Sequence, residues 1–217
     1  RIFMQKPEDM ELFPPELGNW FSYLMLFDDG NRIDLTLIPI NEADDYFNSS
    51  DGLVEILLDK DGLVKEEVIP TDQKYWIKKP TAREFDDCCN EFWWVSTYVA
   101  KGLARKEILF AIDHLHNHVR PNLLRMMAWH IGLENGFGFS LGKNYKFIHQ
   151  HLPKEDWEML LSTYNMGSYT DMWQALFTCH DLFRKYSKEV AVTLGYMYPN
   201  YDKAITKYIQ NIYEQDK

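Results

Sequence analysis

The sequence predicts an α+β protein, in which a strand-rich segment is followed by a bundle of helices. Two apolar runs at residues 20–27 and 31–39, joined by a turn of Asp, Gly and Asn residues, predict a β-hairpin. Further along the chain, apolar side chains recur at the spacing of helices. Lys78-Lys79-Pro80-Thr81 lies between the two patterns, and we therefore expect two domains, residues 1–78 and 79–217.

The strand-rich segment has four further features. Residues 1–5 have an extended pattern, a short helix is expected at 42–47, and another extended run at 53–58 precedes a turn at 59–62. Because the chain starts with Arg1 instead of Met, and does so inside a strand pattern, we expect further protein upstream.

The helical segment begins with a cap signal. Thr81 with Glu84 three residues later is typical of a capping box. The residues that follow at helical spacing should form a buried stripe: Phe85, Cys88, Phe92, Val95 and Val99. Further helices are expected at 104–119, 121–131, 143–151, 154–164, 170–186, 187–196 and 201–214.

Composition limits the class of protein. Of the 217 residues, 46% are hydrophobic, which excludes a disordered chain, and no apolar run reaches the roughly 18–20 residues of a membrane span. Cys88, Cys89 and Cys179 fit neither a disulfide framework nor a zinc site, so we expect reduced thiols in a cytoplasmic protein. A net charge of −10 argues against a nucleic-acid partner; it favours a cationic ligand or serves only solubility.

One carboxylate stands inside the most regular predicted strand. Alternation puts Ile33, Leu35 and Leu37 on one face of this strand and Asp34 on the other, beside Arg32. Aspartate is rare in strands and needs a partner there. Either Arg32 or a neighbouring strand satisfies it, or Asp34 is a metal-binding or proton-accepting carboxylate on a rigid sheet.

Two lysines fall in the first turn of the helix expected at 143–151. Lys143 and Lys146 would there stand beside free backbone N–H groups, an arrangement that attracts phosphate. The alternative is that both point into water. Tyr164 lies downstream, at the end of the helix expected at 154–164. It either presents its ring or hydroxyl to a ligand or only packs against the helix end.

A second face of the helix that starts at Thr81 mixes acids and aromatic rings. Asp87, Glu91, Trp94 and Tyr98 share this face, which suits a ligand with several cationic groups. The alternative is an acidic first turn followed by packing between helices. The histidines of residues 114–118 lack the spacing of a zinc site, and a surface or interface role is favoured for them.

Taken together, these segments resemble a known family, the aminoglycoside 6-adenylyltransferases that adenylylate streptomycin. Five segments carry the resemblance, and it extends over nearly the whole chain: GNRIDLTL at 30–37, EFDDCCNEFW at 84–93, KGLARKE at 101–107, GKNYKFI at 142–148 and LSTY at 161–164. It implies the rest of a nucleotidyltransferase-type mixed sheet followed by an all-helical domain. It also implies transfer of AMP from ATP to a hydroxyl of streptomycin, with Mg²⁺, and hence antibiotic resistance.

The resemblance also assigns roles to residues. It implies that Asp34 holds magnesium, accepts the proton of the substrate hydroxyl, or does both. It implies that Lys146, together with Lys143, contacts the triphosphate and that Tyr164 lies near the nucleotide. Acidic and aromatic residues of the helical domain would bind the two guanidinium groups of the drug, and our candidates are Trp94, Tyr98, Glu107 and Asp113.

The sequence departs from the pattern of the family in one respect. The Gly-Ser turn and the Asp-x-Asp pair of the family lie upstream of the segment that matches Arg1 onward, so we expect these 217 residues not to catalyse adenylyl transfer unaided. The alternative function is that of a non-catalytic, cation-binding or antitoxin-like remnant of the same fold. A third is a helical partner-binding protein. We expect a monomer whose partners are the aminoglycoside and ATP, without nucleic acid or membrane.

Overall fold

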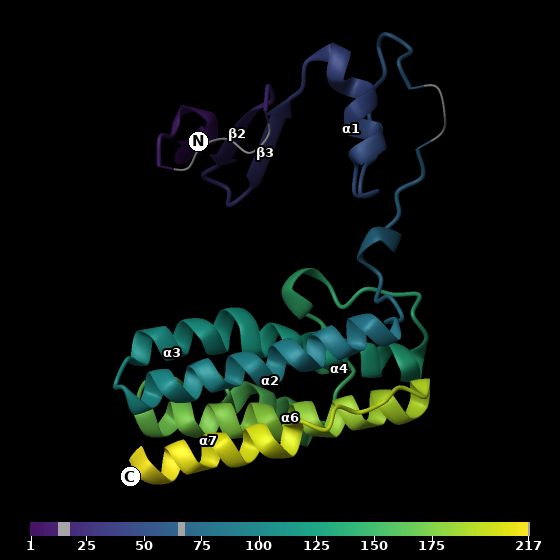
Figure 1. Cartoon of the computed structure of the whole chain (residues 1–217). Helices are drawn as coiled ribbons and strands as arrows, with labels where there is room; N and C mark the ends of the chain where they lie inside the picture. Colours follow the sequence, from purple (N-terminus) through teal and green to yellow (C-terminus); the bar gives the residue numbers. More distant parts are fainter. Residues whose placement is uncertain (13–17, 65–67, 217) are drawn as a thin grey trace. The chain divides into compact units, whose positions relative to one another are not determined.

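The computed structural model describes residues 1–12, 18–64 and 68–216. It divides into two compact units, Arg1–Thr71 and Asp72–Lys217, which are described separately below (Figure 1). The division lies between Thr71 and Asp72, a few residues before the boundary that the sequence suggested at 78/79.

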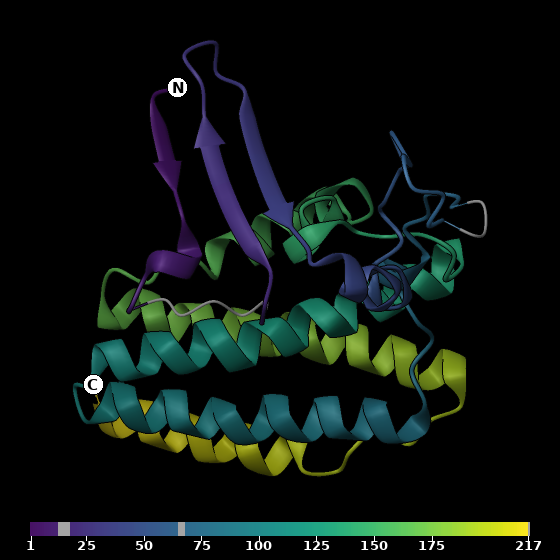
Figure 2. The ribbon, with the colours of Figure 1, turned by 90° about the horizontal axis from the view of Figure 1, so that it is seen from above.

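The first unit contains a three-stranded antiparallel sheet. Strands β1 (Phe3–Gln5), β2 (Phe21–Leu26) and β3 (Arg32–Leu37) lie side by side in the order β1-β2-β3 (Figure 2). Gly30 has a φ of 83°, and its N–H donates to the carbonyl of Phe27 at 3.0 Å, which closes the hairpin turn. The predicted hairpin and the strand at the start of the chain are therefore confirmed.

The faces of this sheet follow the predicted alternation. Leu35 stands opposite Tyr23 and Asp34 opposite Leu24. The apolar side chains of β3 remain about half exposed: Ile33 at 49%, Leu35 at 43% and Leu37 at 50%. The sheet thus has one continuous apolar face that its own unit covers only in part.

The rest of the first unit has little regular structure. A short helix is present as predicted, as η2 (Ile40–Glu42) followed by α1 (Ala43–Ser49), and η1 covers Pro7–Asp9. The extended run expected at 53–58 is not a strand, and Leu57 there is 88% exposed. A strand needs a neighbour for its backbone groups, and no described strand pairs with this segment.

The second unit is helical. After η3 (Gln73–Tyr75) come the helices that form the bundle (Figure 1), with the following bounds: α2 (Ala82–Ala104), α3 (Ile108–His114), the π-turn η4 (Leu115–Val119), α4 (Arg120–Asn135), α5 (Lys154–Ser162), α6 (Tyr169–Leu194) and α7 (Asp202–Asp216). None of the described helices is long and apolar enough to span a bilayer.

One core holds these helices together. The capping box of Thr81 and Glu84 is present, and every residue of the predicted stripe of α2 is buried. At the centre, the rings of Phe92 and Phe183 stack with centroids 3.7 Å apart and planes 5° apart. The three cysteines are free and buried, and burial raises the pKa of the Cys179 thiol to about 12.

Two helix predictions are wrong. The expected helix at 143–151 is replaced by two short turns, η5 (Lys143–Tyr145) and η6 (Ile148–Gln150), because Asn144 and Tyr145 have φ values of 56° and 58°. The helices expected at 170–186 and 187–196 are one helix, α6. Ser187 lies inside this helix, and its hydroxyl donates to the carbonyl of Phe183, four residues earlier.

The predicted helix at 104–119 is divided differently from the expectation. Helix α2 continues to Ala104, and a turn in which Lys106 has a φ of 62° separates it from α3. The end of this segment then widens into the π-turn η4, from which α4 continues without a break. Pro121 stands in the first turn of α4, as expected.

Candidate functional site

In the first unit, Asp34 is engaged by a neighbour on its own strand. Its Oδ1 and Oδ2 accept hydrogen bonds from Nε and Nη2 of Arg32, at 2.8 and 2.7 Å. The two residues are two positions apart on β3 and therefore share a face. The alternative in which Arg32 satisfies this carboxylate is thus the one that the structure shows.

This ion pair is open to solvent. The side chain of Asp34 is 47% exposed and that of Arg32 is 65% exposed. An exposed ion pair of this kind contributes little to folding. The guanidinium of Arg32 presents a planar pair of donors, which also suits a phosphate group.

In the second unit, a cavity of about 440 Å³ opens between α2 and the segment formed by η4 and α4. We call it the acidic cavity. Its lining residues are Glu84, Asp87, Cys88, Glu91, Asn117, His118, Pro121, Asn122, Arg125 and Trp129. Three carboxylates of α2 thus face one arginine of α4, and Asp87 and Glu91 belong to the acid-aromatic face that the sequence predicted.

The carboxylates of the acidic cavity differ in their partners. Glu84 accepts hydrogen bonds from the backbone N–H and the hydroxyl of Thr81, which lower the pKa of its carboxyl. Asp87 pairs with Arg83 on the outside of α2. Glu91 has only a loose contact, 3.9 Å from Nδ1 of His118. Glu91 is therefore the carboxylate that a cationic ligand would engage most readily.

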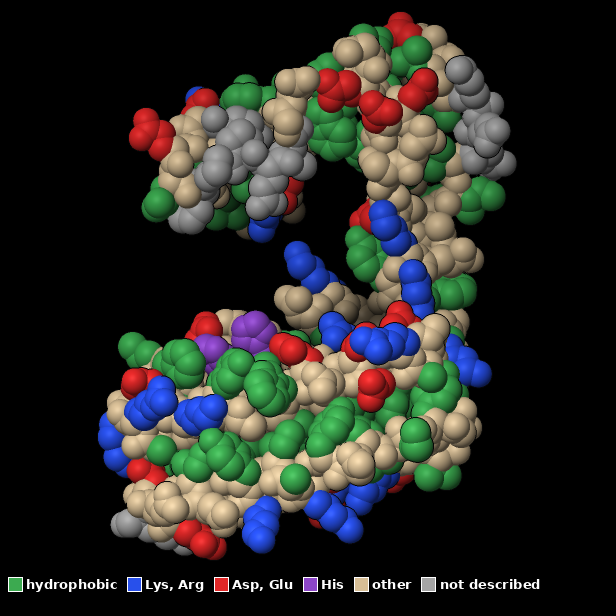
Figure 3. Space-filling view, viewed as in Figure 1, with side chains coloured by type: hydrophobic (Ala, Val, Ile, Leu, Met, Phe, Trp, Pro, Cys, Tyr) green, Lys and Arg blue, Asp and Glu red, His purple; other side chains and the backbone are tan. Residues whose placement is uncertain are grey.

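Aromatic rings continue the acidic cavity along α2 and α3. The indole N–H of Trp94 donates to the hydroxyl of Tyr98 at 2.9 Å, and Trp94 is 56% exposed. The ring of Tyr98 meets His114 at 5.7 Å between centroids, and His114 meets His118 at the same distance. Figure 3 shows histidine and acidic side chains close together on the α2–α3 side of the helical unit.

The predicted drug-binding residues fall into two groups. Trp94 and Tyr98 are in contact, and Asp113 stands beside His114, with its carboxylate accepting a hydrogen bond from Asn117 at 2.7 Å. Glu107 lies at the other end of α3, in the turn after α2, and does not line the acidic cavity. The structure therefore brings Trp94, Tyr98 and Asp113 to one surface and leaves Glu107 apart from them.

The two lysines expected at a helix N-terminus stand instead in a turn. Lys143 and Lys146 are exposed, and Nζ of Lys146 lies 4.8 Å from the centre of the Phe147 ring. Between them, Tyr145 packs against the core, close enough to Arg125 for that charge to act on the pKa of its hydroxyl, which burial raises. The lysine turn is thus adjacent to the acidic cavity, although it offers no helix terminus to a phosphate.

Tyr164 follows the end of α5 and is 43% exposed. The guanidinium of Arg120 lies 3.9 Å from the centre of its ring. The predicted nucleotide residue thus presents an aromatic ring at the surface, with a buried cation on one side of it.

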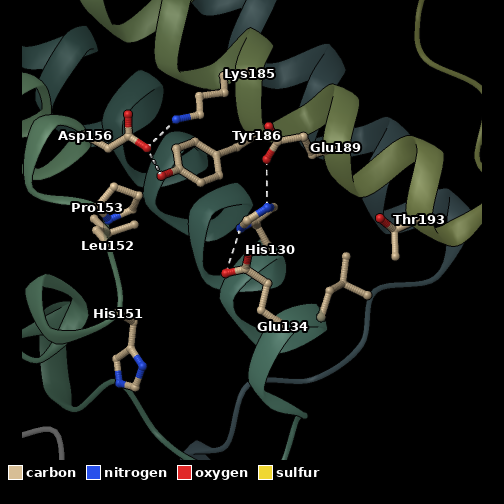
Figure 4. Close-up of a pocket in the computed structure, with 11 residues that line it drawn as sticks. His130, Glu134, His151, Leu152, Pro153, Asp156, Lys185, Tyr186, Glu189 and Thr193 are labelled. Atoms are coloured by element: carbon tan, nitrogen blue, oxygen red, sulfur yellow. Dashed lines mark hydrogen bonds and ion pairs between the residues drawn. The ribbon is translucent and has the colours of Figure 1, made fainter.

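A larger cavity, of about 510 Å³, lies elsewhere in the second unit, among α4, α5 and α6 (Figure 4). Its charged groups bind one another: His130 pairs with Glu189 at 2.7 Å, and Asp156 accepts hydrogen bonds from Lys185 and Tyr186. None of the residues predicted to bind drug or nucleotide lines it. None of them lines the acidic cavity either, but that cavity contains Asp87 and Glu91 of the predicted acid-aromatic face. Because Glu91 has only a loose contact there, whereas the charged groups of the larger cavity bind one another, the acidic cavity is the better candidate site.

Sequence reasoning missed one wall of the acidic cavity. His118, Asn122 and Arg125 face the carboxylates of α2. Of these three, the sequence indicates a role only for His118, at a surface or interface, and it does not single out Asn122 or Arg125. The available signal was their spacing, because polar residues four and three positions apart share one face of an otherwise apolar helix. Within the described part of the chain, no three His, Cys, Asp or Glu side chains are grouped to hold a metal ion.

Comparison with known proteins gives consistent results. A sequence profile described as streptomycin adenylyltransferase matches residues 1–212. The chain is 68% identical over 213 residues to the aminoglycoside 6-adenylyltransferase of Bacillus subtilis (strain 168), covering 98% of this chain and 75% of that protein. It is 56% identical to the Staphylococcus aureus protein of the same name, with 98% and 76% covered.

A solved structure is also similar. The crystal structure of an aminoglycoside 6-adenyltransferase from Bacillus subtilis matches with a TM-score of 0.61 and 64% identity, covering 98% of this chain and 78% of that one. This match confirms the predicted α+β fold class and the resemblance on which the residue roles depend.

Proposed function

The chain belongs to the streptomycin adenylyltransferase family, and on that premise we propose that it transfers AMP from ATP to a hydroxyl of streptomycin. The enzyme class is that of its relatives, which are nucleotidyltransferases. The reaction would inactivate the drug in the cytoplasm, where ATP is available, and we propose a monomer, which size-exclusion chromatography tests.

The acidic cavity is the observation that carries this proposal. A drug with two guanidinium groups needs carboxylates that accept paired N–H bonds and rings over which a cation can rest. Glu91 and Asp87 supply the carboxylates, and Trp94 and Tyr98 supply rings one and two helical turns further along α2. We assign these four residues, with Asp113, to drug binding.

We assign the nucleotide to the two lysines of the lysine turn and to Tyr164. Lys146, with Lys143, would bind the triphosphate through the positive charges of the two ammonium groups. The turn that holds them needs a glycine at position 142, because a Cβ at Gly142 would lie 2.8 Å from Cγ of Lys146. The ring of Tyr164 would take the base.

We propose Asp34 as the group that accepts the proton of the attacking hydroxyl. Its two oxygens are held by Arg32, so the carboxylate has to be released first. The paired donors of Arg32 also suit phosphate oxygens, so a phosphate group that accepts from them would release Asp34. The proton is then taken as oxygen attacks the α-phosphorus and pyrophosphate leaves.

Magnesium is implied by the family and would neutralise charge on the phosphates. The described residues fit it poorly, because Asp34 is paired with Arg32 and no group of three metal ligands is present among them.

The test is an activity assay of the full-length protein that contains these 217 residues. Incubation with ATP, Mg²⁺ and streptomycin should add one AMP group to the drug, which mass spectrometry detects, and should release pyrophosphate. Binding of both ligands without any transfer would reject the enzyme and favour the non-catalytic, cation-binding alternative.

A calorimetric titration of streptomycin tests the acidic cavity. Glu91→Gln should weaken streptomycin binding about tenfold or more, because an ion pair becomes a neutral contact. The matched control is Glu189→Gln, which removes a carboxylate from the larger cavity and should leave the affinity unchanged. Equal effects of the two variants would place the drug elsewhere.

A further inference from the structure

Arg120 is an unusual arginine. It is 1% exposed, and all the hydrogen-bond partners of its guanidinium in the described part of the chain are neutral. Burial lowers the pKa of this group. Arg184, by contrast, is bound by the carboxylate of Asp202 at 2.8 and 2.9 Å. A buried charge without a counter-charge is unfavourable for folding, so Arg120 calls for a functional explanation.

The guanidinium holds the end of α5. Its Nε donates to Oγ1 of Thr163 at 3.2 Å, and its Nη2 donates to the carbonyl oxygen of the same residue. The hydroxyl of Thr163 donates in turn to the carbonyl of Leu160 at 2.7 Å. Arginine suits this position, because the last carbonyl groups of a helix carry partial negative charge.

The π-turn before α4 supplies a further contact. Nη1 of Arg120 lies 2.9 Å from Nδ1 of His116, in the widened turn Leu115–Val119. Because arginine only donates, this nitrogen of His116 must accept. π-Turns are rare and occur often at functional sites. Here the turn supplies a contact to Nη1, while Thr163 at the end of α5 binds Nε and Nη2.

What this arrangement orients is the ring of Tyr164. The residue follows Thr163 directly, and the guanidinium carbon lies 3.9 Å from the ring centre, in cation–π contact. The ring nevertheless keeps 43% of its surface exposed. One side of the ring is thus backed by a fixed, planar cation, and the exposed part is free to receive another planar group.

We propose that Arg120 is a positioning residue of the nucleotide site, which fixes the ring of Tyr164 as a surface on which the base of ATP stacks. The inference rests on the proposed function, since it takes Tyr164 as part of the nucleotide site. Arg120 itself touches no substrate and acts through Thr163 and Tyr164.

The experiment compares ATP and streptomycin binding, each by calorimetry with the complete protein, in Arg120→Lys and in the wild type. Lysine keeps the positive charge, but it lacks the planar guanidinium that donates several hydrogen bonds and stacks on the ring of Tyr164. We expect ATP affinity to fall about tenfold, and the KM for ATP to rise with kcat nearly constant, while streptomycin affinity stays the same. A milder variant, Thr163→Val, removes one acceptor of Arg120 and should act in the same direction with a smaller effect.

Two controls separate positioning from general stability. Arg184→Lys alters another arginine near a ring, that of Trp93 at 5.2 Å, and should lower the Tm without changing ATP affinity. In a Tyr164→Ala background, Arg120→Lys should cause no further loss of ATP affinity, although it still lowers the Tm. A merely structural arginine would lower the Tm in both backgrounds and leave the ATP affinity of the folded protein intact.

The contradicting outcomes are distinct. Unchanged ATP affinity in Arg120→Lys, an equal loss for ATP and streptomycin, or full additivity with Tyr164→Ala would each overturn the positioning role. If the wild type itself neither binds ATP nor transfers AMP, the proposed function fails first, and the inference with it.

Discussion

The sheet unit and the helical unit are stabilised in different ways. Within the described residues of Arg1–Thr71, Ser22 alone has a buried side chain. The helical unit, Asp72–Lys217, contains a continuous core that includes Phe92, Trp93 and Phe183. The sheet unit therefore depends on backbone pairing and turns, whereas the helical unit depends on packing.

The two units also carry different proposed functions. The carboxylate proposed to accept the proton lies on the lightly packed hairpin, in a solvent-exposed ion pair. The groups proposed to bind drug and nucleotide lie on helices or beside them, where packing holds them in place. Substitutions in the first unit should therefore change activity more than stability, and those in the second unit should often change both.

The largest expected effect is on activity and comes from the sheet unit. Asp34→Asn should lower kcat/KM for AMP transfer by about 10²–10⁴-fold, because an amide cannot accept the proton. The circular dichroism spectrum and Tm should change little, since the side chain is 47% exposed. Asp28→Asn, in the turn of the same hairpin and 83% exposed, is the control. Near-normal turnover in Asp34→Asn would reject the assigned role.

The next effect is on stability and comes from the helical unit. Phe92→Ala should lower the free energy of unfolding by about 3–5 kcal/mol, because it leaves a cavity beside Phe183. Leu35→Ala on the sheet, where the side chain is 43% exposed, should cost about 1 kcal/mol or less. Urea unfolding followed by circular dichroism measures both. Equal losses would mean that the two units are stabilised alike.

Acid should also act on the helical unit, through His180. This ring is 2% exposed against Phe92 and Trp93, and burial lowers its pKa to about 3. Between this value and the ordinary pKa of about 6.5, the unfolded chain binds a proton that the folded chain excludes, so stability falls as the pH falls. The loss between pH 6.5 and pH 4 should be about 3 kcal/mol.

The matched variant for this effect is His180→Gln, which keeps a polar side chain and cannot titrate. It should flatten the dependence of the urea midpoint on pH over this range, whatever its stability at pH 7. A slope that persists unchanged in this variant would assign the acid sensitivity to other groups.

A smaller effect tests the lysine turn. Lys146→Ala should raise the KM for ATP about tenfold, because one charge-assisted contact to phosphate is lost, and should leave the KM for streptomycin unchanged. Lys154→Ala, whose side chain is 89% exposed in the first turn of α5, serves as the control. An unchanged apparent affinity for ATP would count against the contact.

The sequence was most informative where local rules decide. Alternation located Asp34 beside Arg32, and helical spacing identified the buried stripe and the acidic residues Asp87 and Glu91. The rules failed at the lysine turn, because Asn144 and Tyr145 adopt left-handed backbone conformations that no residue type there requires. Likewise, no local signal distinguished one long helix α6 from two helices end to end.

The opposite wall of the acidic cavity could not be derived in the same way. Glu91 meets His118 only because α2 packs beside η4, and that pairing is a property of the tertiary fold. The engagement of Asp34 by Arg32 was one of two alternatives, and choosing between them required side-chain positions. Residue types were thus predictable, while their partners across elements were not.

The smallest effect concerns the first turn of α2, where the helical unit begins its packing. Thr81→Ala should cost about 1 kcal/mol at pH 7, because the N–H of Glu84 loses its acceptor. Glu84 completes the box, and its lowered pKa gives a stabilisation that is present above the ordinary glutamate pKa and disappears as the pH falls through the folded value. The difference between wild type and Thr81→Ala should therefore shrink in acid. Because Glu84 also lines the acidic cavity, the variant should weaken streptomycin binding slightly and leave the hairpin intact. A large change at the hairpin would contradict the conclusion that the two units are stabilised in different ways.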